Sequence, residues 1–143
     1  QMRRLSDLIH LSPGQPHNHI APALDLRPYC PGMGAIGLPG DLSSQSRFLR
    51  AAFTKLHALP SGVGQFFRIL DTVVQVKGCC RTPDGGYEHT LYSSCCDMEK
   101  GIYYYITGTG RRIIGIDLNR ENPAGEKLKR WPLMDSEDIL LQN

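Results

Sequence analysis

The chain lacks any long apolar run. Its apolar stretches are short and are interrupted by glycine or polar residues, so none has the length of a membrane span. The start of the chain also lacks the basic segment followed by an apolar segment that marks a secretory signal. These absences predict a cytoplasmic protein that does not interact with membranes.

A strong charge of either sign is also absent. Sixteen Lys and Arg oppose fourteen Asp and Glu, which leaves a formal net charge of +2. The basic residues are scattered, apart from a small group formed by Lys127, Lys129 and Arg130. Because a nucleic-acid-binding surface needs a concentrated basic patch, we expect no nucleic-acid partner.

Cysteine occurs five times, at Cys30, Cys79, Cys80, Cys95 and Cys96. An odd number in a chain without an export signal favours reduced thiols over disulfides. The two adjacent pairs do not suit a four-thiolate metal site, because such sites separate paired ligands by two or more residues, and neighbouring strand residues point to opposite faces. We expect at least one member of each pair to be a buried small apolar side chain.

Two other patterns suggest a ligand, but neither has the right context. His17 and His19 can point the same way in an extended segment, yet they have no third ligand and are interpreted as exposed loop residues. Gly32, Gly34 and Gly37 have the spacing of a dinucleotide-binding loop, but prolines interrupt the segment before them and no helix opens after them. We therefore expect no metal and no cofactor.

The first part of the chain is irregular. Leu5, Leu8 and Ile9 have helical spacing, and the chain starts at Gln1 without an initiator Met, which predicts the last turns of a helix that began upstream. Residues 12–40 carry six prolines and five glycines with no sustained period, so a long connection is expected there. Connections of that length usually lie against another element or serve a site, which indicates a missing partner half.

Helices and then strands are predicted after residue 40. Ser43 or Ser44 can cap a helix that ends before Pro60, and a second helix is expected at residues 64–76. The buried stripe of the first would contain Phe48, Ala51, Ala52, Leu56 and Leu59, and that of the second Phe66, Phe67, Leu70, Val73 and Val74.

Residues 92–96, 101–107 and 112–118 are rich in aromatic and branched side chains, which predicts an antiparallel meander of three strands. Gly108, Thr109 and Gly110 suit a hairpin connection with positive backbone angles. Trp131 and Leu133 either add an edge strand or pack against the domain.

The start of the first predicted helix contains the residues that could carry chemistry. Ser43, Ser44 and Ser46 are not flanked by a nucleophile elbow, and serines before a helix are ordinary caps. Arg47 lies in the first turn, where a positive charge opposes the helix dipole and needs a nearby anion. Spacing alone favours a surface arginine paired with Asp41.

The segment at residues 34–48, Gly-Ala-Ile-Gly-Leu-Pro-Gly-Asp-Leu-Ser-Ser-Gln-Ser-Arg-Phe, resembles a signature of the choloylglycine hydrolase family. That family includes bile salt hydrolases and penicillin V acylases. Further similarity is present at residues 11–16, 65–70, 76–81, 91–96 and 99–105. Family members are much longer than this chain, so residues 1–143 are expected to be the C-terminal part of a single domain.

This resemblance implies an α+β fold, the αββα sandwich of the N-terminal-nucleophile hydrolases, of which this chain would supply two helices plus antiparallel strands. In the family an N-terminal cysteine attacks the amide, and its own amino group handles the proton. All five cysteines here are internal, so the nucleophile would precede Gln1. The family's helix-start arginine maps onto Arg47, which reverses the surface interpretation and makes it the candidate catalytic residue.

The implied activity is that of a bile salt hydrolase, which cleaves the amide between a bile acid and glycine or taurine. The substrate would be a conjugated bile acid, and the complete enzyme would be a homotetramer or a homodimer without metal or cofactor. The alternatives are a penicillin V acylase, or a non-catalytic truncated remnant or bile-acid-binding fragment. The chain alone is expected to be inactive and unstable, because half a sandwich exposes an apolar sheet face.

Overall fold

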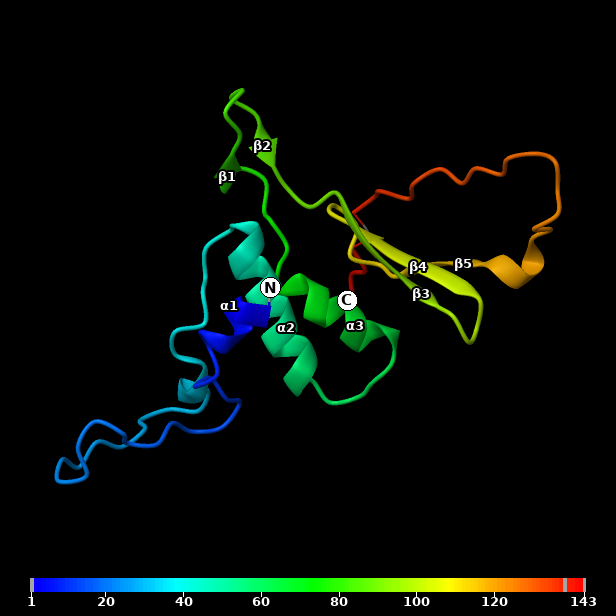
Figure 1. Cartoon of the computed structure of the whole chain (residues 1–143). Helices are drawn as coiled ribbons and strands as arrows, with labels where there is room; N and C mark the ends of the chain where they lie inside the picture. Colours follow the sequence, from blue (N-terminus) through cyan, green and yellow to red (C-terminus); the bar gives the residue numbers. More distant parts are fainter. Residues whose placement is uncertain (1, 138, 143) are drawn as a thin grey trace. The chain divides into compact units, whose positions relative to one another are not determined.

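The computed structural model describes residues 2–137 and 139–142 and divides the chain into two compact units, Gln1–Pro60 and Ser61–Asn143. Figure 1 shows the helices of the first unit in blue to cyan and the strands of the second in green to orange. In this described part of the chain, three α-helices are combined with antiparallel strands, so the secondary structure is of the predicted α+β class.

The first unit contains α1 (Met2–Ser6), the short 3-10 helix η1 (Met33–Ala35) and α2 (Ser44–His57). A helix near the start was predicted, but α1 ends before Leu8 and Ile9, which lie in turns. The prediction for α2 is confirmed, because Ser43 is its N-cap and the helix ends before Pro60. The cap hydroxyl of Ser43 accepts a hydrogen bond from the backbone N–H of Ser46 at 3.3 Å.

Asp41 strengthens this helix start. Its carboxylate accepts hydrogen bonds from the backbone N–H of Ser43 at 2.9 Å and from the hydroxyl of Ser46 at 2.5 Å. Hydrogen bonds from the side chains of Ser43 and Ser46, followed by the backbone of Ser43, lower the pKa of Asp41 from 3.8 to about 2. The charged form of Asp41 is therefore part of the helix cap.

The predicted buried stripe of α2 is only partly correct. Phe48, Ala51 and Ala52 are half-buried, and the buried apolar residue is Leu49, which sequence reasoning left out. Leu56 and Leu59 are exposed, at 72% and 80%. Leu56 lines an apolar hollow of about 170 Å³ within this unit, with leucines of the preceding segments and Phe53. The last turn of α2 therefore borders an unfilled space.

The long connection at residues 12–40 is confirmed and is closed where its two ends meet. Ser12 N–H donates to the carbonyl of Gly34 at 2.9 Å, and Gly34 N–H donates to the carbonyl of Gly14 at 3.1 Å. A Cβ at Gly34 would lie only 2.2 Å from that Gly14 oxygen. Only glycine allows this approach, so Gly34 fixes the base of the loop.

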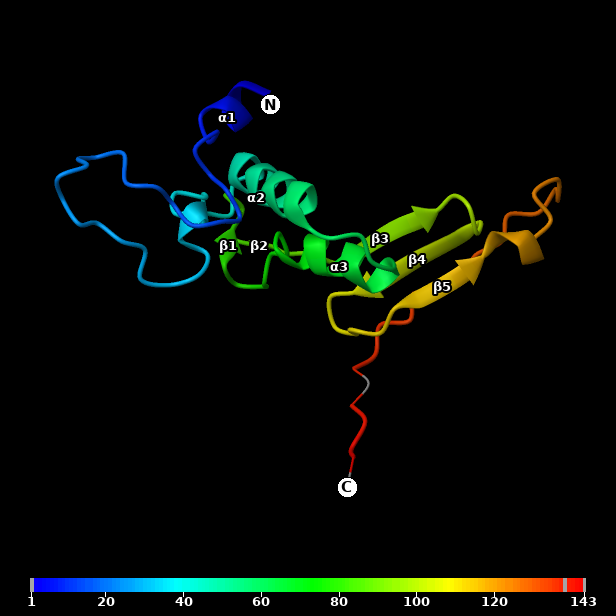
Figure 2. The ribbon, with the colours of Figure 1, turned by 90° about the horizontal axis from the view of Figure 1, so that it is seen from below.

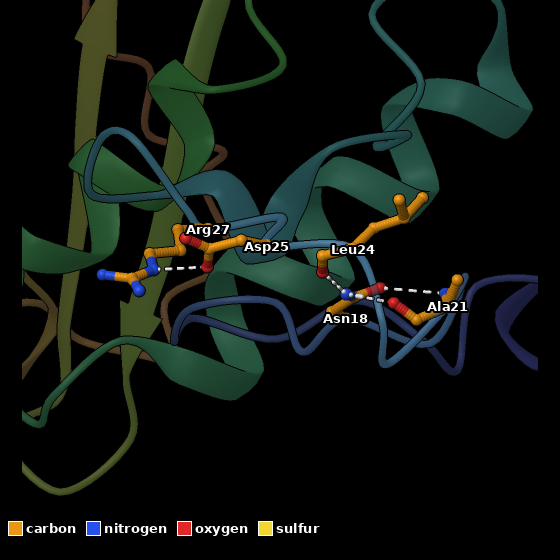
Figure 3. Close-up of polar contacts among 5 residues, drawn as sticks. All are labelled: Asn18, Ala21, Leu24, Asp25 and Arg27. Atoms are coloured by element: carbon orange, nitrogen blue, oxygen red, sulfur yellow. Dashed lines mark hydrogen bonds and ion pairs between the residues drawn. The ribbon is translucent and has the colours of Figure 1, made fainter.

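Inside the loop, the side chain of one asparagine makes hydrogen bonds to the backbone in place of those of a helix or strand. The side chain of Asn18 donates to the carbonyls of Ala21 and Leu24, each at 2.9 Å, as Figure 3 shows. Its Oδ1 accepts from the backbone N–H of Ile20 at 3.0 Å. These bonds satisfy backbone groups that no helix or strand could satisfy.

The second unit opens with α3 (Val63–Asp71), which ends well before the predicted residue 76. The hydroxyl of Thr72 donates to the carbonyl of Ile69 at 2.7 Å. The carbonyl of Gln75 then accepts a hydrogen bond from the backbone N–H of Thr90, and the backbone N–H of Gln75 donates to the hydroxyl of Thr90, each at 3.0 Å. This pairing with a residue distant in sequence extends the chain and stops the helix.

The predicted meander is confirmed as an antiparallel sheet in the order β3-β4-β5, which Figure 2 shows side by side. Its strands are β3 (Tyr92–Asp97), β4 (Ile102–Thr107) and β5 (Ile114–Asp117), followed by the 3-10 helix η2 (Leu118–Arg120). A separate hairpin of β1 (Cys80–Arg81) and β2 (Tyr87–Glu88) was not predicted. Two-residue strands are too short to produce a recognisable pattern.

The prediction of positive backbone angles at Gly108 and Gly110 is wrong. The positive φ in this sheet belongs to Gly101, at 64°, in the turn between β3 and β4. A Cβ at Gly108 would lie 2.8 Å from the carbonyl oxygen of Thr90, and one at Gly110 would lie 2.8 Å from that of Ser136. Close backbone approach, and not a left-handed turn, explains these two glycines.

Few side chains are fully buried in either unit. The buried apolar residues are Leu49 in the first unit and Phe67, Tyr105 and Ile106 in the second. Trp131 and Leu133 are 48% and 55% exposed and form no strand. A contact of this segment with the sheet is made next to them, where the Met134 N–H donates to the Tyr105 hydroxyl at 3.3 Å. Within the described residues, no helix has the length and apolar character needed to cross a membrane.

The loop base gives a direct stability test. Gly34→Ala should lower the free energy of unfolding by about 2 kcal/mol, because the new methyl group collides with backbone. Gly40→Ala is the matched control, since a Cβ there meets nothing within 4 Å. Thermal unfolding of both variants checks this; equal Tm values would contradict the close packing of Gly34.

Asp41 predicts an acid-dependent loss of helix. Because its folded pKa is lowered from 3.8 to about 2, its contribution to stability is complete above 3.8 and is lost as the pH falls through about 2. Asp41→Asn should remove this part of the pH dependence. Far-UV circular dichroism of both proteins over this range measures it, and parallel pH profiles would disprove the role of the Asp41 carboxylate.

Candidate functional site

The candidate site is the start of α2, defined as residues 39–50 and called the α2 start below. Arg47 lies in the first turn and is half-buried. Its backbone N–H donates to the carbonyl of Ser43 at 3.0 Å, so the arginine is already part of the regular helix. The position of its guanidinium group therefore depends on how this first turn is held.

Two side chains fasten the α2 start. Ser46 is 6% exposed, and its hydroxyl donates to Asp41. Arg50 donates from Nη1 to the carbonyls of Pro39 and Asp41, at 2.9 and 2.7 Å. Ser46 precedes Arg47 in the sequence and Arg50 follows it. Their hydrogen bonds thus connect the loop before the helix to its first two turns.

Sequence spacing favoured a surface pairing of Asp41 with Arg47, but in the structure other groups also bind the Asp41 carboxylate. Both carboxylate oxygens of Asp41 accept hydrogen bonds, one from Ser43 and one from Ser46. The first turn of α2 contains no acidic residue, so the charge of Asp41 compensates the helix dipole just before the turn. Ser43 and Ser46 belong to this cap, and Ser44 is the first helical residue.

The glycine spacing before the α2 start has a structural explanation. Gly34 is used for the close packing of the loop base, and Gly32 and Gly37 have positive φ values of 85° and 99°. The segment between Gly32 and Ile36 forms only η1, a three-residue turn of 3-10 helix. The three glycines therefore shape the loop itself.

All five cysteines are free thiols. Cys80 and Cys95 are half-buried and Cys79 and Cys96 are exposed, so one member of each pair is sheltered, though less than predicted. Burial, with smaller effects of Cys96 and Asp97, raises the pKa of the Cys95 thiol. Within residues 2–137 and 139–142, no three His, Cys, Asp or Glu side chains converge as metal ligands.

His17 and His19 lie in the exposed loop, as predicted. Their rings approach edge to face with centroids 6.2 Å apart.

A hollow of about 430 Å³ in the second unit was not predicted as a site. Asp135 lines it beside Thr107 and Thr109, whose hydroxyls lower the pKa of Asp135, that of Thr107 more strongly. A carboxylate held by two threonines has no local sequence signal, because the partners are far apart in the chain.

Comparison with known proteins places these features in a family. Residues 1–139 match the family described as linear amide C–N hydrolases, choloylglycine hydrolase family. The chain is 49% identical over 138 residues to a bile salt hydrolase/transferase of Lactiplantibacillus plantarum, covering 93% of this chain and 43% of that protein. It is 40% identical over 105 residues to a bile salt hydrolase/transferase of Clostridium perfringens, covering 70% and 32%. The chain therefore spans less than half the length of these relatives.

Solved structures agree with this family. A crystal structure of a variant of the conjugated bile acid hydrolase from Clostridium perfringens matches with a TM-score of 0.83 and 33% identity, over 99% of this chain and 46% of that one. Penicillin V acylase from Agrobacterium tumefaciens matches with a TM-score of 0.51 and 22% identity, over 61% and 29%, which shows a shared fold alone. The predicted α+β fold, a part of the αββα sandwich, is confirmed. The chain belongs to the choloylglycine hydrolase family of linear amide C–N hydrolases.

Proposed function

We propose that this chain is part of a bile salt hydrolase, which cleaves the amide bond between a bile acid and glycine or taurine. The observation that carries the proposal is the 49% identity with a bile salt hydrolase/transferase across 93% of the chain. We also propose that residues 1–143 form the C-terminal part of a single catalytic domain, because the relatives are more than twice the length of the matched region.

The proposed chemistry uses a nucleophile that this chain does not contain. An N-terminal cysteine thiolate attacks the amide carbonyl and forms a tetrahedral intermediate. The intermediate collapses to a thioester, and the leaving amine takes its proton from the α-amino group of the same cysteine. Water then hydrolyses the thioester, which releases the bile acid and restores the thiol.

Arg47 is proposed as the catalytic contribution of this chain. Its positive charge lies at the N-terminal end of α2, where the cation and the helix dipole would together attract an anion from the rest of the enzyme. A thiolate nucleophile is the anion whose stabilisation would assist the reaction, because a nearby cation lowers the pKa of a thiol. Arg47 would thus increase the fraction of reactive nucleophile.

Two other functions compete with this one. Penicillin V acylase activity is favoured only by a shared fold at 22% identity. A non-catalytic remnant or a bile-acid-binding fragment is supported by the large number of exposed apolar side chains, such as Leu91 at 65% and Ile139 at 71%. Identity across almost the whole chain favours the bile salt hydrolase.

The remaining properties of the complete enzyme are proposed from the family resemblance. It would be a cytoplasmic homotetramer or homodimer that uses no metal and no cofactor. A conjugated bile acid would be its small-molecule substrate.

A hybrid enzyme tests the proposal. In it, the 138 residues of the Lactiplantibacillus plantarum protein that match this chain are replaced by the present sequence. We expect release of glycine from glycocholate and of taurine from taurocholate, measured by mass spectrometry, with much slower release of phenoxyacetate from penicillin V. A folded hybrid that prefers penicillin V, or that cleaves none of the three substrates, would refute the assignment.

The chain by itself should show no turnover of glycocholate, since none of its internal cysteines carries a free α-amino group. The same assay at high protein concentration measures this, with the hybrid enzyme as the positive control. Hydrolysis by the isolated chain, lost on Cys95→Ala, would instead place the nucleophile within these residues.

Arg47→Ala in the hybrid should lower kcat/KM by about 100-fold, because a preorganised charge is removed from the reacting groups. Arg47→Lys should retain part of the activity, since it keeps the charge but not the planar guanidinium geometry. Arg120→Ala is the matched control, with a side chain 84% exposed. Steady-state kinetics on glycocholate decide the outcome, and equal kcat/KM values for Arg47→Ala and Arg120→Ala would return Arg47 to a surface role.

A further inference from the structure

The fastening of the α2 start is stronger than a helix cap requires. Ser43 alone satisfies the N–H of Ser46, which is the usual function of an N-cap. Asp41 adds a second set of contacts, because one carboxylate oxygen accepts from Ser43 N–H and the other from the Ser46 hydroxyl. One of these added contacts is made by Ser46, the residue that directly precedes Arg47.

Arg50 holds the same loop from the opposite direction. It lies one turn after Arg47 and donates to the backbone carbonyls of Pro39 and Asp41. Asp41 is therefore fixed through both its carboxylate and its main chain. Since Ser46 and Arg50 flank Arg47 on the helix, a shift of Asp41 would be passed to the first turn that carries Arg47.

The charges of Arg47 and Asp41 indicate what these contacts at the α2 start do. Arg47 is a cation in a turn that has no acidic residue of its own, where the helix dipole disfavours it. The carboxylate of Asp41 lies just before that turn and supplies the missing negative charge. Asp41 accepts hydrogen bonds from Ser43 and Ser46, so its charge is held in place just before the turn that carries Arg47.

We propose that Asp41 and Ser46 are positioning residues for Arg47, and that their hydrogen bond holds the guanidinium in the place where it acts on the nucleophile. This inference rests on the proposed function. Asp41 touches neither substrate nor nucleophile and works only through Arg47. Preorganised charges lose much of their effect when they move by about 1 Å, so a loosened turn reduces the rate without removing any reacting group.

The first test uses the hybrid enzyme defined above. Asp41→Asn and Ser46→Ala should each lower kcat/KM for glycocholate by about 10-fold, chiefly through kcat, because a positioning contact is worth less than the catalytic group itself. The acid limb of the kcat/KM profile should move to higher pH, since a poorly placed Arg47 stabilises the thiolate less. Asp84→Asn is the matched control, because Asp84 is also an exposed aspartate whose pKa is lowered by a hydroxyl, that of Thr82.

A double-mutant cycle separates positioning from simple stability. If Asp41 acts through Arg47, then Asp41→Asn should cause less than a twofold further loss in the Arg47→Ala background, where about 10-fold is lost in the parent. A purely structural residue would lower activity to the same extent in both backgrounds. Equal losses, or an acid limb that stays in place while the activity falls, would overturn the proposal.

A second measurement needs no turnover and uses the 143-residue chain. The Nε–H resonance of Arg47 in ¹⁵N NMR should be resolved from those of free arginine side chains in the parent, and should move to the free-arginine position in Asp41→Asn. An unchanged resonance would refute the positioning role even if the hybrid is inactive. An inactive but folded hybrid, by contrast, would count against the proposed function alone.

Discussion

The hydrogen bond from the buried hydroxyl of Ser46 to the carboxylate of Asp41 is the contact on which the first unit depends. A buried hydroxyl without an acceptor is costly, so Ser46 holds Asp41, and with it the end of the long connection, against α2. The other constraint on that connection is the close approach of Gly34 to Gly14. These two contacts fix both ends of the irregular segment at residues 12–40, and they thereby hold α2 in one orientation within its unit.

Local signals were sufficient where a single segment decides its own structure. α2 could be predicted because a serine cap and Pro60 mark its ends, and the strands because aromatic and branched residues alternate with turns. The end of α3 could not, since it is set by the pairing of Gln75 with Thr90. The glycines after β4 were misread because a glycine can be required by a positive φ or by a close backbone approach, and both look alike in sequence.

The candidate site was accessible to sequence reasoning only in part. Spacing identified Arg47 as a cation that opposes a helix dipole, but it also suggested Asp41 as the partner, because sequence does not show which donors compete for a carboxylate. In the structure the serines occupy that carboxylate. The contacts of Arg50 with backbone carbonyls carry no sequence signal, since every residue has a carbonyl. Only the family resemblance favoured a catalytic role.

The pKa shifts of Cys95 and Asp41 agree with the proposed roles, in which Arg47 assists a nucleophile and Cys95 is not that nucleophile. A cysteine nucleophile needs a lowered pKa, which requires a cation or a helix N-terminus beside the thiol. Burial and the neighbouring Cys96 and Asp97 instead raise the pKa of Cys95, which keeps it a thiol at neutral pH. The α2 start has the opposite properties: a cation at a helix N-terminus, with a carboxylate already engaged by hydroxyl and backbone donors. Such a turn is suited to stabilise an anion brought to it, which supports the proposal that Arg47 activates the nucleophile.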